Sequence, residues 1–267
     1  MFRYEEYYAE NRFSFFIKKI WVLDNMDGLL AVSGKSVLPN GCFNIAVVEG
    51  KGLAITHKGW QKQLHCGSYF CGQMTEAVSV HIAARTRATM LQLHPWVPAH
   101  FTQADMSQFT DRIVSLKTIE VNALLADRLP GMTPQAIYQA LVQSYAPLLE
   151  MGAVSQLVYK GASTILDSEG TTTVAGLASG LGCSQRHLQK IFKRHIGLSP
   201  KQLSLIIRLR AAVDALAYPG TEKVSMAALA VDSSFYDQAH FINAFRSFAK
   251  TSPKKISIAD YFLSFKK

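Results

Sequence analysis

The sequence lacks the features that mark membrane, exported and disulfide-linked proteins. It has no run of 18 or more apolar residues, so we expect no membrane-spanning helix. The first residues, MFRYEEYYAENRF, are acidic and lack the basic and apolar segments of an export signal, so we expect the protein in the cytoplasm. Cysteine is scarce and no CxxC pair occurs, which excludes a disulfide framework in a chain of this length. We expect free, mostly buried thiols at Cys42, Cys66, Cys71 and Cys183.

Charged residues are also few. Asp, Glu, Lys and Arg make up 18% of the chain, too little for a disordered protein, whereas 49% of the residues are hydrophobic. A chain of 267 residues exceeds the usual size of one domain, and each half is long enough to bury its own core. We therefore expect two folded domains.

The charge is unevenly distributed along the chain. Residues 1–154 contain 13 Lys and Arg against 12 Asp and Glu, whereas residues 155–267 contain 15 against 7. Almost all of the net charge of +9 therefore lies in the C-terminal part. A basic part beside a neutral one suggests that one domain binds a polyanion, although charge alone does not distinguish DNA, RNA and an anionic membrane.

Local patterns divide the chain into a β-rich part and a helical part. Residues 13–92 contain short runs of Val, Ile, Phe and Tyr, broken at close intervals by turns such as Asn40-Gly41 and Lys58-Gly59, which predicts an antiparallel sandwich or barrel. Thr133-Pro134 offers an N-cap followed by proline, so we expect a helix over 134–151. From Ser155 onward every segment has a helical pattern.

These patterns predict a two-domain α+β chain. The N-terminal domain is an antiparallel β sandwich or barrel followed by helices, and the C-terminal domain is all-α. We place a β-rich domain at 1–115, a helical region at 116–154 and an all-α domain at 155–267.

The C-terminal part contains an internal repeat. The string TVAGLA, which begins at Thr173, returns as SMAALA from Ser225, 52 residues later. Four further positions return 53 residues later: Ser184, Phe192, Ser199 and Pro200 as Asp237, Phe245, Ser252 and Pro253. The one-residue slip falls where a turn is expected, so the pattern indicates a duplicated supersecondary unit.

Each copy has the plan of a helix-turn-helix. A cap, Thr173 or Ser225, opens a short helix; after a tight turn a second cap, Ser184 or Asp237, opens a second helix. The second helices carry apolar residues at spacings of three and four: Leu188, Ile191 and Phe192 in one copy, Phe241, Ala244 and Phe245 in the other. We place the two units at 173–193 and 225–247.

The outward faces of the two second helices suit base reading. Gln and Asn pair with adenine, Arg and Lys reach guanine, and small apolar groups meet a thymine methyl. A surface helix commonly carries such residues on its solvated side, but two capped copies in a basic segment favour DNA. The outward residues are Gln185, Arg186, Gln189, Lys190 and Lys193 in the first copy, and Gln238, Ala239, Ile242, Asn243 and Arg246 in the second.

One long helix is expected between the two units, from Pro200 to about Ala217. Such a connector fixes the two reading helices relative to each other. If both project on the same side, they enter successive major grooves about 34 Å apart.

Two strings carry a resemblance to a known family. They are LASGLGCSQRHLQKIFKRHIGLSPKQ, from Leu177 to Gln202, and ALAVDSSFYDQAHFINAFRSFAKTSPKK, from Ala228 to Lys255. Over about residues 155–260 the chain resembles the AraC/XylS family of bacterial transcription regulators. The resemblance implies base-reading roles for Arg186, Gln189, Lys190, Gln238, Ala239 and Asn243, and phosphate contacts for Lys193 and Arg246.

The second copy departs from the family pattern in two places. Ser234 stands where the family has a turn glycine, which strains a left-handed residue by about 1 kcal/mol. Lys250-Thr251 stands where the first copy has Gly197-Leu198. Whether the second unit reads bases therefore stays open at this point.

The N-terminal half resembles the family's β-rich, cupin-like sensor or dimerisation domains through three short strings. These are Leu38-Pro39-Asn40-Gly41, Gly72-Gln73-Met74-Thr75 and Thr110-Asp111-Arg112-Ile113-Val114. The resemblance implies a small-molecule effector, a homodimer, or both, and an activator that contacts RNA polymerase. Apolar residues of the 116–151 region supply either a dimer interface or intradomain core: Ile119, Leu124, Leu125, Ile137, Leu141 and Leu148.

The alternative from another class is a metal- or redox-dependent cupin-like module, in which the N-terminal half has an enzymatic role. Its candidate ligands are His57, His65, Cys66, Cys71, His81, His94 and His100. No HxH, HExxH or CxxC spacing brings them together, and no GxSxG nucleophile string occurs. RNA binding is disfavoured because the aromatic residues of the helical part fall on core positions. We therefore expect no enzyme, no cofactor and no metal site.

Overall fold

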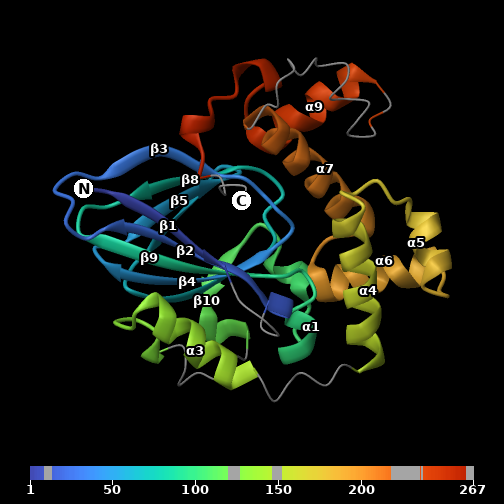
Figure 1. Cartoon of the computed structure of the whole chain (residues 1–267), viewed down its shortest axis with the longest axis horizontal. Coiled ribbons are helices and arrows are strands. Elements are labelled where there is room, and N and C mark those ends of the chain that lie inside the picture. Colours follow the sequence, from blue (N-terminus) through green and yellow to red (C-terminus); the bar gives the residue numbers. More distant parts are fainter. Residues whose placement is uncertain (9–13, 120–126, 146–151, 218–234, 236, 263–267) are drawn as a thin grey trace.

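The computed structural model describes residues 1–8, 14–119, 127–145, 152–217, 235 and 237–262. Within these residues a β-rich N-terminal half is followed by helices, and the C-terminal half is mainly helical (Figure 1). The predicted two-domain α+β fold class is therefore confirmed. Among the described helices, none is both long and apolar enough to cross a membrane.

The strands form two antiparallel sheets. The larger one contains, from edge to edge, β1 (Arg3–Tyr8), β2 (Ile17–Asn25), β9 (Thr86–Leu93), β4 (Phe43–Gly50), β7 (Gly67–Cys71) and β10 (Ile113–Ser115). The smaller one contains β3 (Val32–Val37), β8 (Val78–Ile82), β5 (Leu53–His57) and β6 (Trp60–Leu64). The antiparallel sandwich expected from residues 13–92 is confirmed.

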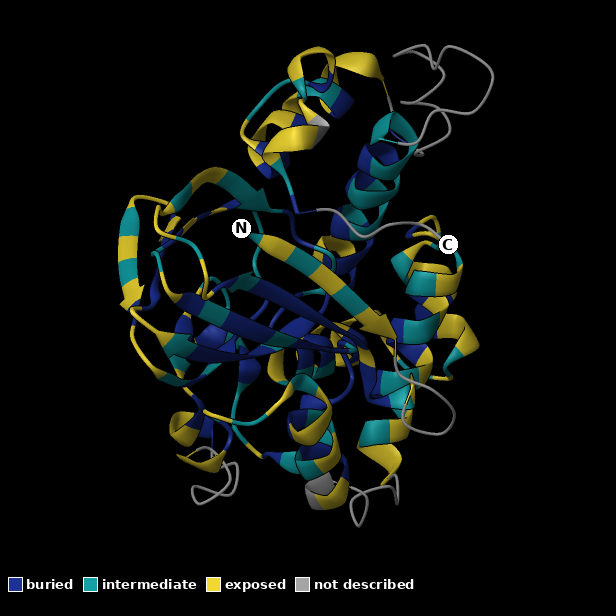
Figure 2. Cartoon of the chain, turned by 60° about the vertical axis from the view of Figure 1, so that its left-hand side comes forward, coloured by how far each residue is buried: buried dark blue, intermediate teal, exposed yellow. Residues whose placement is uncertain are grey.

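The central strands of the larger sheet are buried on both faces. In β4, whose sequence is almost continuously apolar, Ile45 and Val47 belong to a core shared with the helices, while Ala46 and Val48 face the smaller sheet. Alternate side chains of a strand point to opposite faces, so a strand covered on both sides needs apolar residues at every position. Figure 2 shows these strands as the buried centre of the molecule.

Two strands lie outside the stretch in which strands were expected. β1 is an edge strand of sequence RYEEYY, paired only with β2 among the described strands, and it is largely exposed. β10 has three residues and follows a left-handed residue, Asp111, with a φ of 58°. Neither has the alternating apolar pattern on which the expectation rested.

The helical elements follow in chain order. In the N-terminal half they are α1 (Pro98–Phe101), η2 (Met106–Phe109), η3 (Leu116–Ile119) and α3 (Pro134–Tyr145). The C-terminal half has α4 (Ala153–Asp167), α5 (Val174–Gly180), α6 (Gln185–Ile196), α7 (Pro200–Ala217), α9 (Gln238–Ala249), η5 (Pro253–Lys255) and η6 (Ile258–Asp260). The predicted helix from Pro200 to Ala217 is confirmed, and so is the start at Pro134. The predicted end at Met151 lies outside the described residues.

The helical region after β10 packs against the body of the protein. Ile119, Ile137 and Leu141 are fully buried in the core shared by the larger sheet and the helices, and α3 lies beside that sheet (Figure 1). These three residues are thus intradomain core, one of the two alternatives left open by the sequence. Leu124, Leu125 and Leu148 lie outside the described residues.

The last described residues return to the N-terminal half. The backbone N–H of Phe262 donates to Ser36 O at 2.9 Å, and the Phe262 ring lies 5.6 Å from the ring of Tyr4. The expectation that every segment after Ser155 is helical is therefore wrong here. These residues hydrogen-bond to the exposed edge of β3 and cover aromatic side chains. Such a long-range pairing leaves no local pattern in the sequence.

Candidate nucleic-acid interface

The first helix-turn-helix unit is formed by α5 and α6, with the predicted caps in place. Thr173 Oγ1 accepts a hydrogen bond from Gly176 N at 3.1 Å, and Ser184 Oγ accepts one from His187 N at 3.2 Å. Gly182 turns the chain between the helices with a φ of 65°, in the left-handed region that favours glycine. The cap and turn predictions for this unit are confirmed.

The helix α6 separates its apolar and polar residues by face. Leu188, Phe192 and Ile196 are completely buried, whereas Ile191 is half-buried. The predicted DNA-contacting residues of this helix, Arg186, Gln189, Lys190 and Lys193, are all exposed. The structure therefore brings the predicted first-unit residues together on one solvent-facing side, as the spacing of three and four residues requires.

The second predicted reading helix, α9, has the same construction. Asp237 caps it by accepting a hydrogen bond from His240 N at 2.7 Å. Phe241, Phe245 and Phe248 are buried, while the predicted DNA-contacting residues Gln238, Ala239, Asn243 and Arg246 are exposed. The first helix of this unit, from Ser225, and the turn residue Ser234 lie outside the described residues.

α6 and α9 end in the same left-handed conformation, but with different residues. Gly197 closes α6 with a φ of 82°, and Lys250 closes α9 with a φ of 60°. A left-handed residue at this position is normally glycine because a Cβ is unfavourable there. Lys250 thus adopts the conformation that glycine supplies in the first unit.

One predicted phosphate contact is already engaged within its own helix. Lys193 Nζ donates to Gly197 O at 3.0 Å, at the C-terminus of α6, where a cation also interacts favourably with the helix dipole. Lys193 remains exposed, so its ammonium is available to a phosphate beside the helix end. The structure places Lys193 at the end of the helix and Arg186 at its start, on the first turn after the cap.

Two helices hold the first unit in place. Gly161 of α4 lies so close to Phe192 of α6 that a Cβ there would be 2.8 Å from Phe192 Cε2. The connector α7 contributes buried residues such as Leu203, Ile206 and Leu209 to the shared core. Arg208 of α7 places its guanidinium 4.8 Å from the centre of the Phe235 ring, directly before α9. The described parts of both units, α6 and α9, therefore pack against α7.

The histidines and cysteines of the N-terminal half are dispersed. Within the described residues, no three His, Cys, Asp or Glu side chains are close enough together to hold a metal ion. His57 is buried and bonds Asp111, with 3.0 Å between Nε2 and Oδ1. His94 stacks on Trp96 at 4.4 Å between ring centres, and burial lowers its pKa to about 4. Cys71 is buried between the sheets, where burial raises its pKa to about 12.

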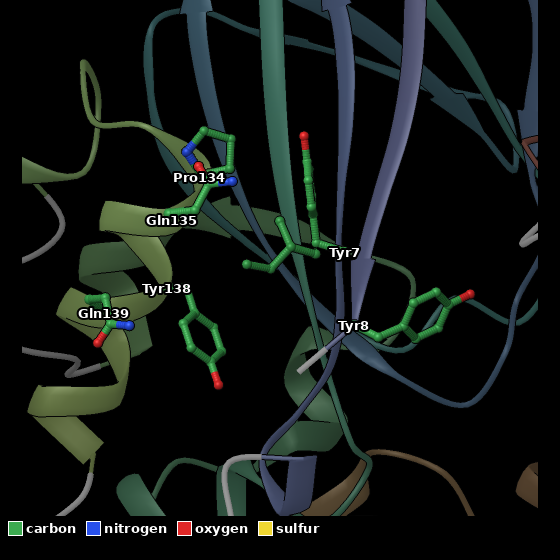
Figure 3. A pocket seen from close by; sticks show the side chains of 7 residues that line it. Tyr7, Tyr8, Pro134, Gln135, Tyr138 and Gln139 are labelled. Atoms are coloured by element: carbon green, nitrogen blue, oxygen red, sulfur yellow. The ribbon is translucent and has the colours of Figure 1, made fainter. Parts of the chain in front are cut away.

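Three hollows were not foreseen from the sequence. A cavity of about 70 Å³ lies between the two sheets, lined by apolar residues with Asn44 as a polar exception. It adjoins a polar pocket of about 40 Å³ that shares Trp21, Asn44 and Met74 with it and includes Gln73. On the outer surface, an open groove of about 210 Å³ lies between β1, β2 and α3, with Tyr7 and Tyr138 on its sides (Figure 3).

Comparisons with known proteins agree with this arrangement in the C-terminal half. Residues 177–257 match a model described as a helix-turn-helix domain, and residues 5–115 match one described as a domain of unknown function (DUF6597). No match was found among curated proteins.

Several solved structures are similar to the chain at low identity. ToxT from Vibrio cholerae is 9% identical, with 95% of this chain and 97% of that chain covered and a TM-score of 0.47. An AraC-type regulator from Chromobacterium violaceum is 24% identical over 39% of this chain and 92% of its own, with a TM-score of 0.34. The C-terminal domain of AraT from Geobacillus stearothermophilus is 20% identical over 43% and 95%, with a TM-score of 0.36.

The matched segment 177–257 spans both reading helices and the connector between them. The chain carries an AraC-type helix-turn-helix domain at residues 177–257 behind a β-rich N-terminal half, and it is a DNA-binding transcription regulator.

Proposed function

We propose that the protein binds specific DNA sequences by placing α6 and α9 in successive major grooves. The observation that supports this most directly is the common construction of the two helices. Each has a capped start, a buried apolar face and an exposed face that carries the candidate base-reading residues, and α7 connects the two units. Arg186, Gln189 and Lys190 read one groove, and Gln238, Ala239 and Asn243 read the next. Lys193 and Arg246 bind phosphates.

The domain limits follow from the same proposal. Residues 155–267 form the DNA-binding domain, residues 1–115 the regulatory domain, and residues 116–154 connect them. The proposed molecule is a regulator and not an enzyme. It activates transcription through RNA polymerase, which is the commoner mode in the family. A reporter fused to the target promoter tests this. If the protein is an activator, deleting it lowers expression of the reporter.

Selection from fragmented genomic DNA tests the specific binding. The full-length protein is incubated with the fragments at two salt concentrations, and the retained DNA is sequenced. We expect one motif made of two blocks about one helical turn apart. Random DNA that is lost uniformly at the higher salt would show only an electrostatic surface and would contradict the proposal.

We further propose that the N-terminal half binds a small effector between its two sheets. The apolar cavity there continues into the polar pocket that contains Gln73. Gln73 is 1% exposed, and its Oε1 has no hydrogen-bond partner within the described part of the chain. A buried acceptor without a partner costs about 1–3 kcal/mol. The pocket therefore favours a small, mainly apolar molecule with one hydrogen-bond donor.

Titration with short primary alcohols and with alkanes of equal length tests the preference for a hydrogen-bond donor. Trp21 lines both the apolar cavity and the polar pocket, so its fluorescence reports binding of either compound. We expect the alcohols to bind more tightly, and the difference to vanish in Gln73→Leu. Equal binding of alcohol and alkane by the unmodified protein would contradict the proposed role of Gln73.

A further inference from the structure

The C-terminal end of the second reading helix is attached to the N-terminal half. Ala77 N donates to Phe248 O, in the last turn of α9, at 2.7 Å. Glu76, the preceding residue, forms an ion pair with Lys250, the residue that closes α9. A backbone hydrogen bond and an ion pair from two consecutive residues thus hold the same helix end.

The C-terminal end of the first reading helix is attached in the same way. Thr110 Oγ1 donates to Gly197 O, at the end of α6, at 2.8 Å. The approach is close: a Cβ on Gly197 would lie 2.8 Å from Met106 O and 2.8 Å from Thr110 Oγ1. The α6 end therefore rests directly on η2 and the residue that follows it.

One hydrogen-bonded network joins these two attachments. Asp111, next to Thr110, accepts hydrogen bonds from Thr75 N at 2.8 Å and from His57 Nε2 at 3.0 Å. His57 Nδ1 lies 3.4 Å from Ala77 O, and Asp111 N donates to Gln73 O at 2.8 Å. We call this network the docking bracket; its members are His57, Gln73, Thr75, Glu76, Ala77, Thr110 and Asp111.

The first half of the connector α7 rests on the same side of the N-terminal half. Gln73 Nε2 donates to Gly41 O at 2.9 Å, and Gly41 lies under α7, where a Cβ would be 2.8 Å from Leu203 Cδ1. The three short strings noted in the N-terminal sequence, around Gly41, Gln73 and Asp111, thus meet at one face against the reading domain. The three strings are far apart in the chain, and folding brings them together at this interface.

The bracket leaves the reading surface free. A recognition helix contacts bases mainly with its N-terminal residues, and Arg186, Gln189, Gln238 and Ala239 are exposed in the docked arrangement. Both attachments lie at the opposite, C-terminal ends of the helices. Docking is therefore compatible with DNA binding and constrains where the two reading helices stand.

Lys250 supports this interpretation. It adopts a left-handed conformation with a φ of 60°, where the first unit has Gly197. Glycine closes a helix more favourably at such a position, whereas only a long cation reaches Glu76. The residue that makes the interdomain ion pair thus occupies a position where the local backbone favours glycine.

We infer that the docking bracket sets the separation of the two reading helices, so that the N-terminal half determines which spacing of DNA blocks the protein prefers. This inference rests on the proposed double reading of DNA. Two linked binding modules bind tightly together only when their separation matches that of their sites. Thr110, Glu76 and Asp111 are positioning residues that do not touch DNA themselves.

The test measures the affinity of the full-length protein for duplexes in which the spacer between the two selected blocks changes one base pair at a time. For the unmodified protein we expect affinity to fall about tenfold or more when the spacer departs by two or three base pairs from the best value. In the double variant Thr110→Val, Lys250→Gly the fall should be less than about threefold. Binding to a single block should change little.

Three controls keep the outcomes apart. Glu76→Gln weakens the same ion pair but keeps the positive charge of Lys250. If Glu76→Gln also flattens the spacing profile, the effect of the double variant does not come from losing the Lys250 charge. Asp127→Asn removes an ion pair with Lys117 in the same half of the chain and should leave the profile unchanged. Lys250→Gly supplies the residue that the backbone favours, so its urea midpoint should not fall.

The results distinguish the inference from the proposed function. The inference is overturned if the double variant and Glu76→Gln both show a spacing profile as steep as that of the unmodified protein. In that case α7 alone sets the separation of the two reading helices. If the unmodified protein prefers neither a motif nor a spacing, the proposed function itself is wrong.

Discussion

Arg186 and Lys193 are both exposed cations of α6 but stand at opposite ends of it, with Lys193 bonded to Gly197 O. We expect Arg186→Ala to weaken binding to the selected motif by about 1–3 kcal/mol and to relax preference at one base position. Lys193→Ala should weaken binding to selected and random DNA alike and reduce the salt dependence by about one charge. Binding isotherms on both DNAs at several salt concentrations measure this. Equal losses on both DNAs for both variants would refute base reading by Arg186.

His94 makes stability depend on pH. Burial, with a smaller effect of the Lys18 charge, lowers its pKa from 6.5 to about 4. The unfolded chain then takes up a proton at a higher pH than the folded protein does, so the contribution of His94 is full above pH 6.5 and is lost as the pH falls towards 4. From pH 7 to pH 5 this amounts to about 2 kcal/mol.

His94→Phe keeps an aromatic ring on Trp96 without a titrating group. Urea unfolding at pH 7 and pH 5 should therefore show a smaller loss of unfolding free energy for the variant than for the unmodified protein. Identical losses would mean that His94 is protonated equally in the folded and unfolded states.

Individual residues differ in how far the sequence predicts them. Thr173, Ser184 and Asp237 were predicted as caps because capping depends on a side chain and the backbone two or three residues ahead. The roles of His57 and Asp111 were not predicted, because their contact joins positions 54 residues apart. His57 was a candidate metal ligand by residue type, and the structure gives it a carboxylate and a carbonyl as partners instead.

At the scale of elements, amphipathic helices were predicted well and marginal strands were not. The connector α7 has the predicted ends because proline at its start and the apolar positions along it are local signals. β1 is polar and exposed, and its tyrosines bond glutamates of the same strand, as Tyr7 does with Glu5 at 2.5 Å. Its strand structure comes from pairing with β2, which no short stretch of sequence specifies.

The packing of α4 on α6 gives a prediction at this scale. Gly161→Ala would place a Cβ 2.8 Å from Phe192 Cε2 and 3.3 Å from Leu181 Cδ1, and Phe192 is completely buried. Crowding of a packed core costs about 1–3 kcal/mol, against a gain of about 1 kcal/mol from replacing glycine in a helix. We expect a net loss of about 1 kcal/mol in unfolding free energy, measured by urea denaturation.

Gly180→Ala is the matched control. Gly180 is the last residue of α5, and a Cβ there meets nothing within 4 Å. The same helix-propensity gain, without the contact, should leave stability unchanged or raise it by up to about 1 kcal/mol. If both variants were equally stable, α4 and α6 would pack less closely than the structure shows.

On the scale of the whole molecule, the basic C-terminal half and the nearly neutral N-terminal half differ in sequence pattern but share one hydrophobic core. A single cluster of buried residues includes Phe16, Trp96 and Met106 on one side and Val158, Phe192 and Leu203 on the other. The sequence predicted each half because periodicity and charge are properties of segments. It did not predict the interface, because the contacts of Thr110 with Gly197 and of Glu76 with Lys250 span 87 and 174 positions.

A shared core predicts that the two halves unfold together. All three tryptophans, Trp21, Trp60 and Trp96, lie in the N-terminal half, whereas most of the described helix lies in the C-terminal half. Tryptophan fluorescence and far-ultraviolet circular dichroism therefore report different halves of the same molecule. During urea unfolding we expect both signals to change with one midpoint and one slope, as a cooperative transition requires.

Asp111→Asn sharpens this measurement because it weakens the network between the two halves. Burial alone would raise the pKa of Asp111, but hydrogen bonds from His57, Lys58 and Thr75 outweigh it and hold the pKa well below its usual value of 3.8. The carboxylate thus stabilises the folded state above about pH 4, and this contribution is lost as the pH falls further. At pH 7 the variant should shift the fluorescence and dichroism midpoints downward by the same amount. Two separated transitions in the unmodified protein, or a shift of the fluorescence midpoint alone in the variant, would show that the halves fold independently and that the interface adds little to either.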